Sequence, residues 1–179
     1  MKCIECGNEE VEVIEKDGEE RYSCSKGHVN ERMIKNKGLE YYKEDGEVIH
    51  RSVGALIIND GEVLLLKRRK YPYKYSIPAG HLEENEDPDV AVTREVLEET
   101  GIEKGSEAFE KIFSGKIDDP CRRGCDIHDW SLYTLMLGEK PNTSSNEEAE
   151  KLEWVSLDEL GSLELTAPTQ NFLVERDLP

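Results

Sequence analysis

Three glutamates in the segment from residue 80 to residue 102 have spacings that suit binding of a divalent metal ion. Glu95, Glu98 and Glu99 are three and four positions apart, so in a helix they form one acidic face. Like charges at these spacings destabilise a helix by about 0.2–0.5 kcal/mol per pair. Carboxylate oxygens are the ligands that Mg²⁺ and Mn²⁺ prefer. Two interpretations are therefore open, a solvated acidic face and a metal site.

The residues around these glutamates have the signals of a helix. Asp87 is a candidate N-cap, Pro88 suits the first helical position, and Gly101 suits the position just past the end. At about 100° per residue, one broad arc of the helix is apolar and is expected to face the core. Its members are Val90, Val92, Val96 and Leu97.

The spacing of the whole segment resembles the signature of the Nudix hydrolase family. Gly80 is followed after five residues by Glu86, and after seven more by residues 94–102, REVLEETGI, which agree with the family pattern at its fixed positions. The similarity extends over about residues 48–175. It implies an α/β fold, a Nudix-type α/β/α sandwich with a mixed sheet, in which the signature forms a loop, a helix and a second loop.

The resemblance also implies a set of metal ligands. Glu95, Glu98 and Glu99 would bind Mg²⁺ or Mn²⁺, and the backbone carbonyl of Ala79 or Gly80 would add a ligand. The implied reaction is hydrolysis of a diphosphate linkage in a nucleoside diphosphate derivative by a metal-activated water. Glu98 and Glu99 are then catalytic as well as metal-binding residues.

Two further roles follow from the same resemblance. Glu86 would pair with Arg94 and hold the helix against the preceding loop, because an arginine can bind a carboxylate through two parallel hydrogen bonds. A general base is expected on a late loop outside the signature. Glu147, Glu148 and Glu150 are the candidates there, and Glu148 is preferred.

Residues 1–30 contain a second metal-binding pattern. Cys3-x2-Cys6 is followed by Cys24-x3-His28, with a hairpin signal at residues 16–18 between the two halves. Thiolate and imidazole donors at this spacing suit a closed, tetrahedral zinc site. So short a segment has too few apolar residues for a core, so a metal would stabilise it. The segment resembles a zinc ribbon, and the alternative is a set of free thiols with a surface histidine.

A zinc ribbon before a Nudix domain resembles the arrangement in the NADH pyrophosphatase group. The Ser-Gln-Pro-Trp-Pro-Phe-Pro type motif that this group carries after the signature is absent from the chain. This absence argues against NADH as the substrate. NADH or ADP-ribose pyrophosphatase activity is one alternative that the resemblance implies. From a different class, the domain could be a non-catalytic Nudix ligand sensor or interaction module, with the ribbon as its docking element.

A basic and aromatic segment precedes the signature. Arg68, Arg69 and Lys70 could contact the phosphates of a substrate, or could be the solvated end of a strand. Tyr75 could stack on a nucleobase or simply pack within its loop.

The remaining cysteines suggest a second metal site of imperfect spacing. Cys121-x3-Cys125-x2-His128 provides three donors, with Asp119 or Asp126 as a candidate fourth ligand. The alternative is a pair of buried or loop thiols.

Short apolar runs give the elements that must position these residues. Residues 53–58 and 63–66 are predicted strands, joined by Asn59-Asp60-Gly61 as a hairpin turn. Further strands are predicted at 108–114, 132–137 and 152–155, and a helix is expected to begin at 157–160. The chain is thus divided into a ribbon at 1–30, a connector at 31–47 that can add a strand, and a catalytic domain at 48–179.

Composition restricts the partners. Forty acidic against 23 basic residues give a net charge of −17, which argues against a nucleic-acid partner but permits a small phosphorylated substrate bound through cations. The chain contains no run of 18 apolar residues and begins without an apolar leader. We therefore expect a cytoplasmic protein without a membrane partner, and a homodimer is one candidate assembly.

Overall fold

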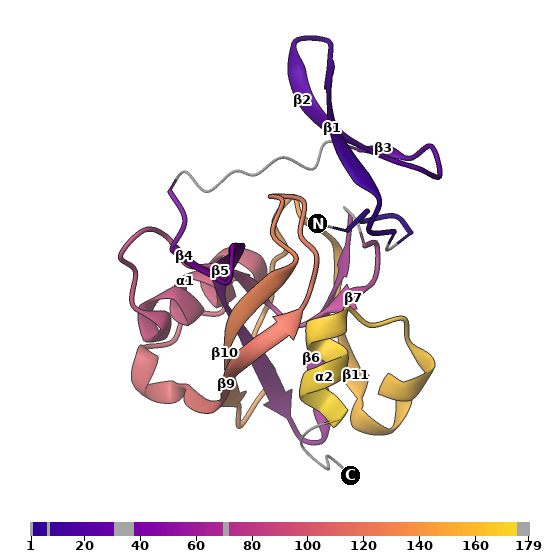
Figure 1. The fold of residues 1–179 in the computed structure, drawn as a ribbon. Helices are drawn as coiled ribbons and strands as arrows, with labels where there is room; N and C mark the ends of the chain where they lie inside the picture. The colour runs from indigo at the N-terminus through magenta and orange to yellow at the C-terminus, as the bar shows by residue number, and fades with distance from the viewer. Residues whose placement is uncertain (1, 7, 31–37, 70–71, 175–179) are drawn as a thin grey trace.

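The computed structural model describes residues 2–6, 8–30, 38–69 and 72–174. Its N-terminal part is a small antiparallel sheet that projects from one end of a larger body (Figure 1). The small sheet has the order β1-β2-β3, with bounds β1 (Val11–Lys16), β2 (Glu19–Cys24) and β3 (Val29–Asn30). Asp17 and Gly18, both at positive φ, form the turn between β1 and β2. The predicted hairpin is therefore confirmed.

The body is built on one mixed sheet with the central order β11-β6-β5-β10-β9. Strands β5 and β10 pair in parallel, whereas the other named strand pairs are antiparallel. The strands are β4 (Tyr41–Glu44), β5 (Glu47–Asn59), β6 (Glu62–Arg68), β7 (Tyr75–Ser76), β8 (Ala79–His81), β9 (Glu110–Asp118), β10 (Ile127–Met136) and β11 (Ala149–Ser156).

The hairpin predicted between the first two long strands is present. Asp60 and Gly61 both have positive φ, as a two-residue hairpin turn requires. Strands β5 and β10 both begin several residues before the apolar runs that indicated them, because polar side chains such as His50 and His128 occupy their first halves. The connector contributes the predicted strand as β4, and its residues 31–37 lie outside the described residues.

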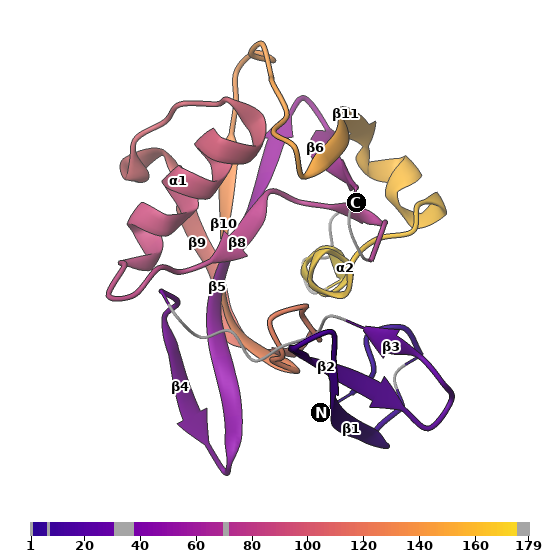
Figure 2. The same ribbon diagram turned by 90° about the horizontal axis from the view of Figure 1, so that it is seen from above.

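Two hydrophobic clusters, one on each face of the sheet, make the body a three-layer α/β/α sandwich. Alternate residues of β5 point to opposite faces, so Val53, Ala55 and Ile57 join the first cluster and Leu56 and Ile58 join the second. Helix α1 (Pro88–Thr100) covers the first face. The second face is covered by α2 (Ala167–Val174) and by the 3-10 helix η2 (Leu157–Ser162), whereas a second short helix, η1 (Ser106–Ala108), precedes β9. Figure 2 shows α1 and α2 on opposite sides of the strands.

Helix α1 begins and ends where the sequence predicts. The side chain of Asp87 accepts a hydrogen bond from the Asp89 amide at 2.8 Å, and Gly101, at φ 73°, donates to the Leu97 carbonyl. The expected apolar arc is only half right, because Val90 is 56% and Leu97 46% exposed. The face that packs on the sheet instead contains Ala91, Val92, Val96 and Glu99.

Helix α2 was not predicted from the sequence. Its first turn contains a threonine and a proline, which obscure the helical pattern, and it is only eight residues long. Phe172 nevertheless anchors it, since this ring is buried and packs against Trp130 at a centroid distance of 5.7 Å. Among the described residues, no helix has the length and apolarity that crossing a membrane requires.

Candidate functional site

Arg94 joins helix α1 to the loop that precedes it. Its Nε and Nη2 atoms donate to the two carboxylate oxygens of Glu86, each at 2.8 Å, and Nη2 also donates to the His81 carbonyl at 3.1 Å. The guanidinium holds the pKa of the Glu86 carboxyl below its usual value. This arrangement agrees with the pairing expected from the signature and fixes the loop relative to the helix.

Two of the three helix glutamates lie against strand β8, Glu99 buried and Glu95 half-buried. The Ala79 amide donates to a Glu99 carboxylate oxygen at 2.8 Å, and a side chain at Gly80 would place its Cβ 2.1 Å from the Glu95 carboxylate. Burial raises the pKa of Glu99 to about 8 and also raises the pKa of Glu95. Close approach at Gly80 therefore lets Glu95 lie directly against the backbone of β8.

The carboxylates of the three glutamates have different partners: Glu95 and Glu98 contact Arg94, whereas Glu99 accepts from the Ala79 amide. Arg94 Nη1 lies 2.7 Å from Glu95 Oε1 and 3.5 Å from Glu98 Oε2, and the Glu98 side chain is 56% exposed. Two groups of four potential metal ligands do lie within 4.8 Å of one another among the described residues, but neither group contains these glutamates. The Arg94 guanidinium thus lies between the Glu95 and Glu98 carboxylates and offsets the repulsion between their negative charges.

The acidic face of α1 forms one wall of a cleft of about 1710 Å³. Basic side chains from other elements line the same cleft, namely Arg68, Lys74, Arg122 and Arg123. Among the three loop candidates for a general base, Glu148 lines the cleft and its charge raises the pKa of Glu99. Glu147 lines a neighbouring depression, and Glu150 is not among the lining residues of either hollow.

Of the predicted substrate-binding residues Arg68, Arg69, Lys70 and Tyr75, Arg68 lines the cleft. The Nε atom of Arg68 is buried there without a hydrogen-bond partner among the described residues. Arg69 instead donates to the Ala149 carbonyl at 2.8 Å, and Tyr75 donates to Glu153 at 3.0 Å. Lys70 lies outside the described residues. Arg69 and Tyr75 therefore form hydrogen bonds to other residues of the protein.

Several lining residues of the cleft escaped the sequence analysis. Arg122 and Arg123 lie on the loop between β9 and β10, and Trp130 lies on β10. Trp130 has a buried Nε1 without a hydrogen-bond partner among the described residues. No local pattern marks these positions, because pairing between strands far apart in the sequence brings them to the cleft.

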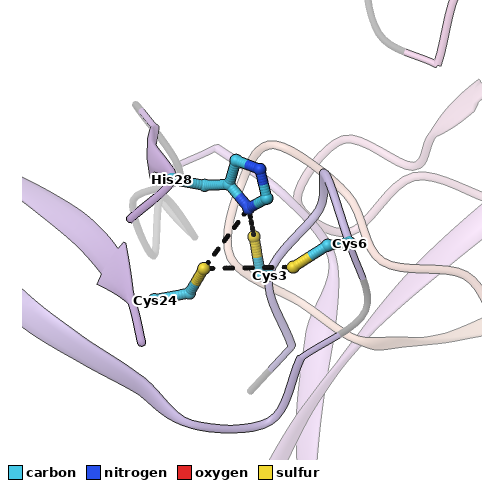
Figure 3. Close-up of side chains that lie close together, drawn as sticks. All are labelled: Cys3, Cys6, Cys24 and His28. Atoms are coloured by element: carbon cyan, nitrogen blue, oxygen red, sulfur yellow. Dashed lines mark hydrogen bonds between the residues drawn. The ribbon is translucent and has the colours of Figure 1, made fainter. Parts of the chain in front are cut away.

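In the N-terminal part, the four predicted zinc ligands face one another (Figure 3). His28 Nδ1 lies 3.8 Å from Cys3 Sγ and 3.4 Å from Cys24 Sγ, and Cys6 Sγ lies 3.9 Å from Cys24 Sγ. The four donor atoms lie within 4.8 Å of one another, so they could hold one metal ion. Lys2 of this part forms an ion pair with Asp118 of β9 at 3.1 Å.

The second predicted donor set is only partly gathered. Cys121 and His128 belong to a group of four donors, but its other members are His50 and His81. Cys125 instead contacts the Val48 and Ile127 carbonyls through its sulfur, at 2.9 and 2.6 Å. The candidate fourth ligands Asp119 and Asp126 do not belong to the group either.

Comparison with known proteins agrees with the fold and the signature. The family model for the NUDIX domain matches residues 48–176. ADP-ribose pyrophosphatase of Methanocaldococcus jannaschii is 28% identical over 138 residues, covering 75% of this chain and 77% of the relative. Prenyl-diphosphate phosphatase of Methanosarcina mazei is 29% identical over 132 residues, covering 68% and 71%. The crystal structure of a MutT protein from Methanosarcina mazei superposes with a TM-score of 0.57 at 26% identity, covering 72% of this chain and 91% of that one.

The chain belongs to the Nudix family. With the signature, its helix glutamates and the Glu86–Arg94 pair all present, it is a pyrophosphohydrolase that acts on phosphorus-containing acid anhydrides.

Proposed function

We propose that this protein hydrolyses a diphosphate linkage in a nucleoside diphosphate derivative in the presence of Mg²⁺ or Mn²⁺, and that ADP-ribose is the first substrate to test. The observation that carries the proposal is the composition of the cleft. One wall is the acidic face of α1, and the residues around it provide four basic side chains. A diphosphate bridged by cations to the glutamates would meet these basic groups with its remaining oxygens.

The residues of α1 fit a hard divalent cation. All three side chains offer oxygen donors, and burial raises the pKa of Glu95 and Glu99, so a cation beside them would stabilise their charged forms. Glu95, Glu98 and Glu99 would hold the ion, with the Ala79 or Gly80 carbonyl as a further donor. When bound, Mg²⁺ would polarise the diphosphate and lower the pKa of an attacking water.

Other residues of the cleft have positioning and proton-transfer roles in this proposal. The Nε of Arg68 and the Nε1 of Trp130 are buried without a hydrogen-bond partner among the described residues. A substrate oxygen would accept a hydrogen bond from each. Glu148, which lines the cleft just before β11 and whose charge raises the pKa of Glu99, would take the proton from water.

The test is a hydrolysis screen with Mg²⁺ or Mn²⁺ over ADP-ribose, NADH, nucleoside triphosphates, dinucleoside polyphosphates, nucleotide sugars and a prenyl diphosphate. We expect turnover of ADP-ribose that requires the divalent ion. Preference for the prenyl diphosphate would overturn the nucleotide substrate class, which the similarity to a prenyl-diphosphate phosphatase makes a necessary comparison. A folded protein that binds nucleotides without hydrolysing any of them would instead favour the ligand sensor.

The N-terminal residues form a structural zinc ribbon in the same proposal. Four protein donors leave no open position on a tetrahedral ion, so the site would stabilise the fold rather than catalyse. The ribbon would support the edge of the cleft, since Glu5 lies among the lining residues and Lys2 contacts β9.

Replacing Cys24 by Ser is expected to release the ribbon zinc and unfold residues 1–30 while the body stays folded. The reason is that so small a sheet depends on its metal, whereas the body has its own two-sided core. Limited proteolysis should then cleave within residues 1–30 and leave a stable fragment. Unchanged zinc content and unchanged protease resistance in Cys24→Ser would contradict the ribbon site. The matched control is Ser23→Ala on the same strand.

A further inference from the structure

The chain contains four histidines, and three of them meet in the body. His50, His81 and His128 come from β5, β8 and β10, and their ring centroids are 5.2, 5.6 and 5.2 Å apart. Cys121, from the loop between β9 and β10, completes a group whose four donor atoms lie within 4.8 Å of one another. These residues are far apart in the sequence, so only the fold brings them together.

The register of the sheet places the three rings on one face. His128 pairs directly with His50 across the parallel β5–β10 ladder. His81 pairs with Ser52 across the β5–β8 ladder, and Ser52 is two residues from His50. Paired residues, and residues two apart in a strand, point to the same side of a sheet. The convergence is therefore a consequence of the backbone and does not depend on one rotamer.

The distances between donor atoms suit a tetrahedral zinc ion. His81 Nε2 and His128 Nε2 are 3.2 Å apart, and Cys121 Sγ and His50 Nδ1 are 3.8 Å apart. With Zn–N of about 2.0–2.1 Å and Zn–S of about 2.3 Å, neighbouring tetrahedral ligands lie about 3.3–3.8 Å apart. The ribbon donors have similar spacings, from 3.4 to 3.9 Å.

The carboxylate of Asp119 lies next to the imidazole ring of His128. Asp119 Oδ2 lies 3.8 Å from His128 Nδ1, on the opposite edge of the ring from the Nε2 atom that faces His81. A carboxylate that orients the distal nitrogen of a metal-bound imidazole is a frequent feature of zinc sites. Asp119 would thus act as an orienting residue rather than as the fourth ligand.

We propose that His50, His81, Cys121 and His128 bind one structural zinc ion in the body of the protein. Cys125 is left outside the site, because its sulfur contacts two backbone carbonyls and accepts from the His50 amide. The ion would fasten the loop between β9 and β10 to β5 and β8. It would thereby hold Arg122 and Arg123 at the cleft, next to the strand whose His81 carbonyl binds Arg94.

The competing explanation is a hydrogen-bonded group of neutral histidines without a metal. The two explanations predict different zinc contents, whichever substrate the enzyme hydrolyses. The measurement is zinc per chain by elemental analysis after gel filtration in Mg²⁺, which is added to keep zinc from the proposed carboxylate site of α1. We expect about two zinc ions in the wild type, one in each four-donor group, and about one in Cys121→Ser.

Matched variants show which of the two sites loses its zinc ion. Cys125→Ser, in the same loop, should keep both ions, and Cys24→Ser should lose only the ribbon ion. In Cys24→Ser loaded with Co²⁺, the absorption spectrum should show a tetrahedral ion with a single thiolate ligand, and this signal should disappear in the double variant with Cys121→Ser. His81→Asn provides a second removal at a half-buried ring, in case the loop variant does not fold. One zinc in the wild type that Cys24→Ser removes, or two that survive both Cys121→Ser and His81→Asn, would overturn the site.

Discussion

Replacing Glu98 by Gln is expected to lower kcat/KM for the Mg²⁺-dependent reaction by about 10²–10³-fold without unfolding the protein. The side chain is 56% exposed, and within the helix it contacts Arg94 at 3.5 Å. An amide of the same shape therefore changes the packing very little. It does remove the negative charge that would hold the cation against the diphosphate. The effect should fall on catalysis rather than on stability.

The measurement is a Michaelis–Menten series over a range of Mg²⁺ concentrations, together with thermal unfolding of both proteins. Glu103→Gln is the matched control, because this exposed glutamate follows the helix and is not among the residues that line the cleft. Wild-type turnover and Mg²⁺ dependence in Glu98→Gln would remove Glu98 from the proposed metal site. A large fall in melting temperature would instead indicate a structural role.

Features encoded within a short stretch of sequence could be predicted. The signature helix has its N-cap at Asp87 and its left-handed terminator at Gly101, and both signals lie within one or two residues of the helix ends. The two hairpin turns are equally local, since each is a dipeptide with positive φ. The Glu86–Arg94 pair followed from the signature and is present in the fold.

The orientation of α1 could not be predicted from periodicity alone. Val90 and Leu97 are apolar yet exposed, whereas Glu99 is buried because the Ala79 amide binds its carboxylate. The face of α1 that contacts β8 therefore differs from the arc that contains all of its apolar residues. The helix thus keeps a hydrogen-bonded carboxylate at the sheet surface while two apolar side chains stay exposed.

Residues brought together by strand pairing were the least predictable. The sequence pointed to Cys121, Cys125 and His128 because they are close along the chain, but the group of donors takes His50 and His81 instead of Cys125. His50 and His128 are 78 positions apart and face each other only through the parallel β5–β10 register. The same reason explains why Arg122 and Trp130 were missed as lining residues of the cleft.

The close approach of Gly80 to Glu95 leads to the second large expected effect. In Gly80→Ala, the new Cβ would lie 2.1 Å from the Glu95 carboxylate, a distance that no atom pair of this kind tolerates. The carboxylate is the free end of a side chain, so it can move while the backbone of β8 stays in place. It would then leave the position in which β8, Arg94 and the proposed cation meet. We expect a folded enzyme whose Mg²⁺ requirement rises by about tenfold or more and whose kcat falls.

Gly138→Ala is the control, because nothing lies within 4 Å of a Cβ at that position and its φ is not positive. Both variants lose the same backbone freedom, so a difference between them measures the contact with Glu95. If Gly80→Ala keeps wild-type Mg²⁺ dependence, Glu95 does not bind the catalytic ion from the position it has here. If Glu95→Gln and Gly80→Ala shift the Mg²⁺ dependence equally, and the double variant shifts it no further, then the glycine acts through that carboxylate alone.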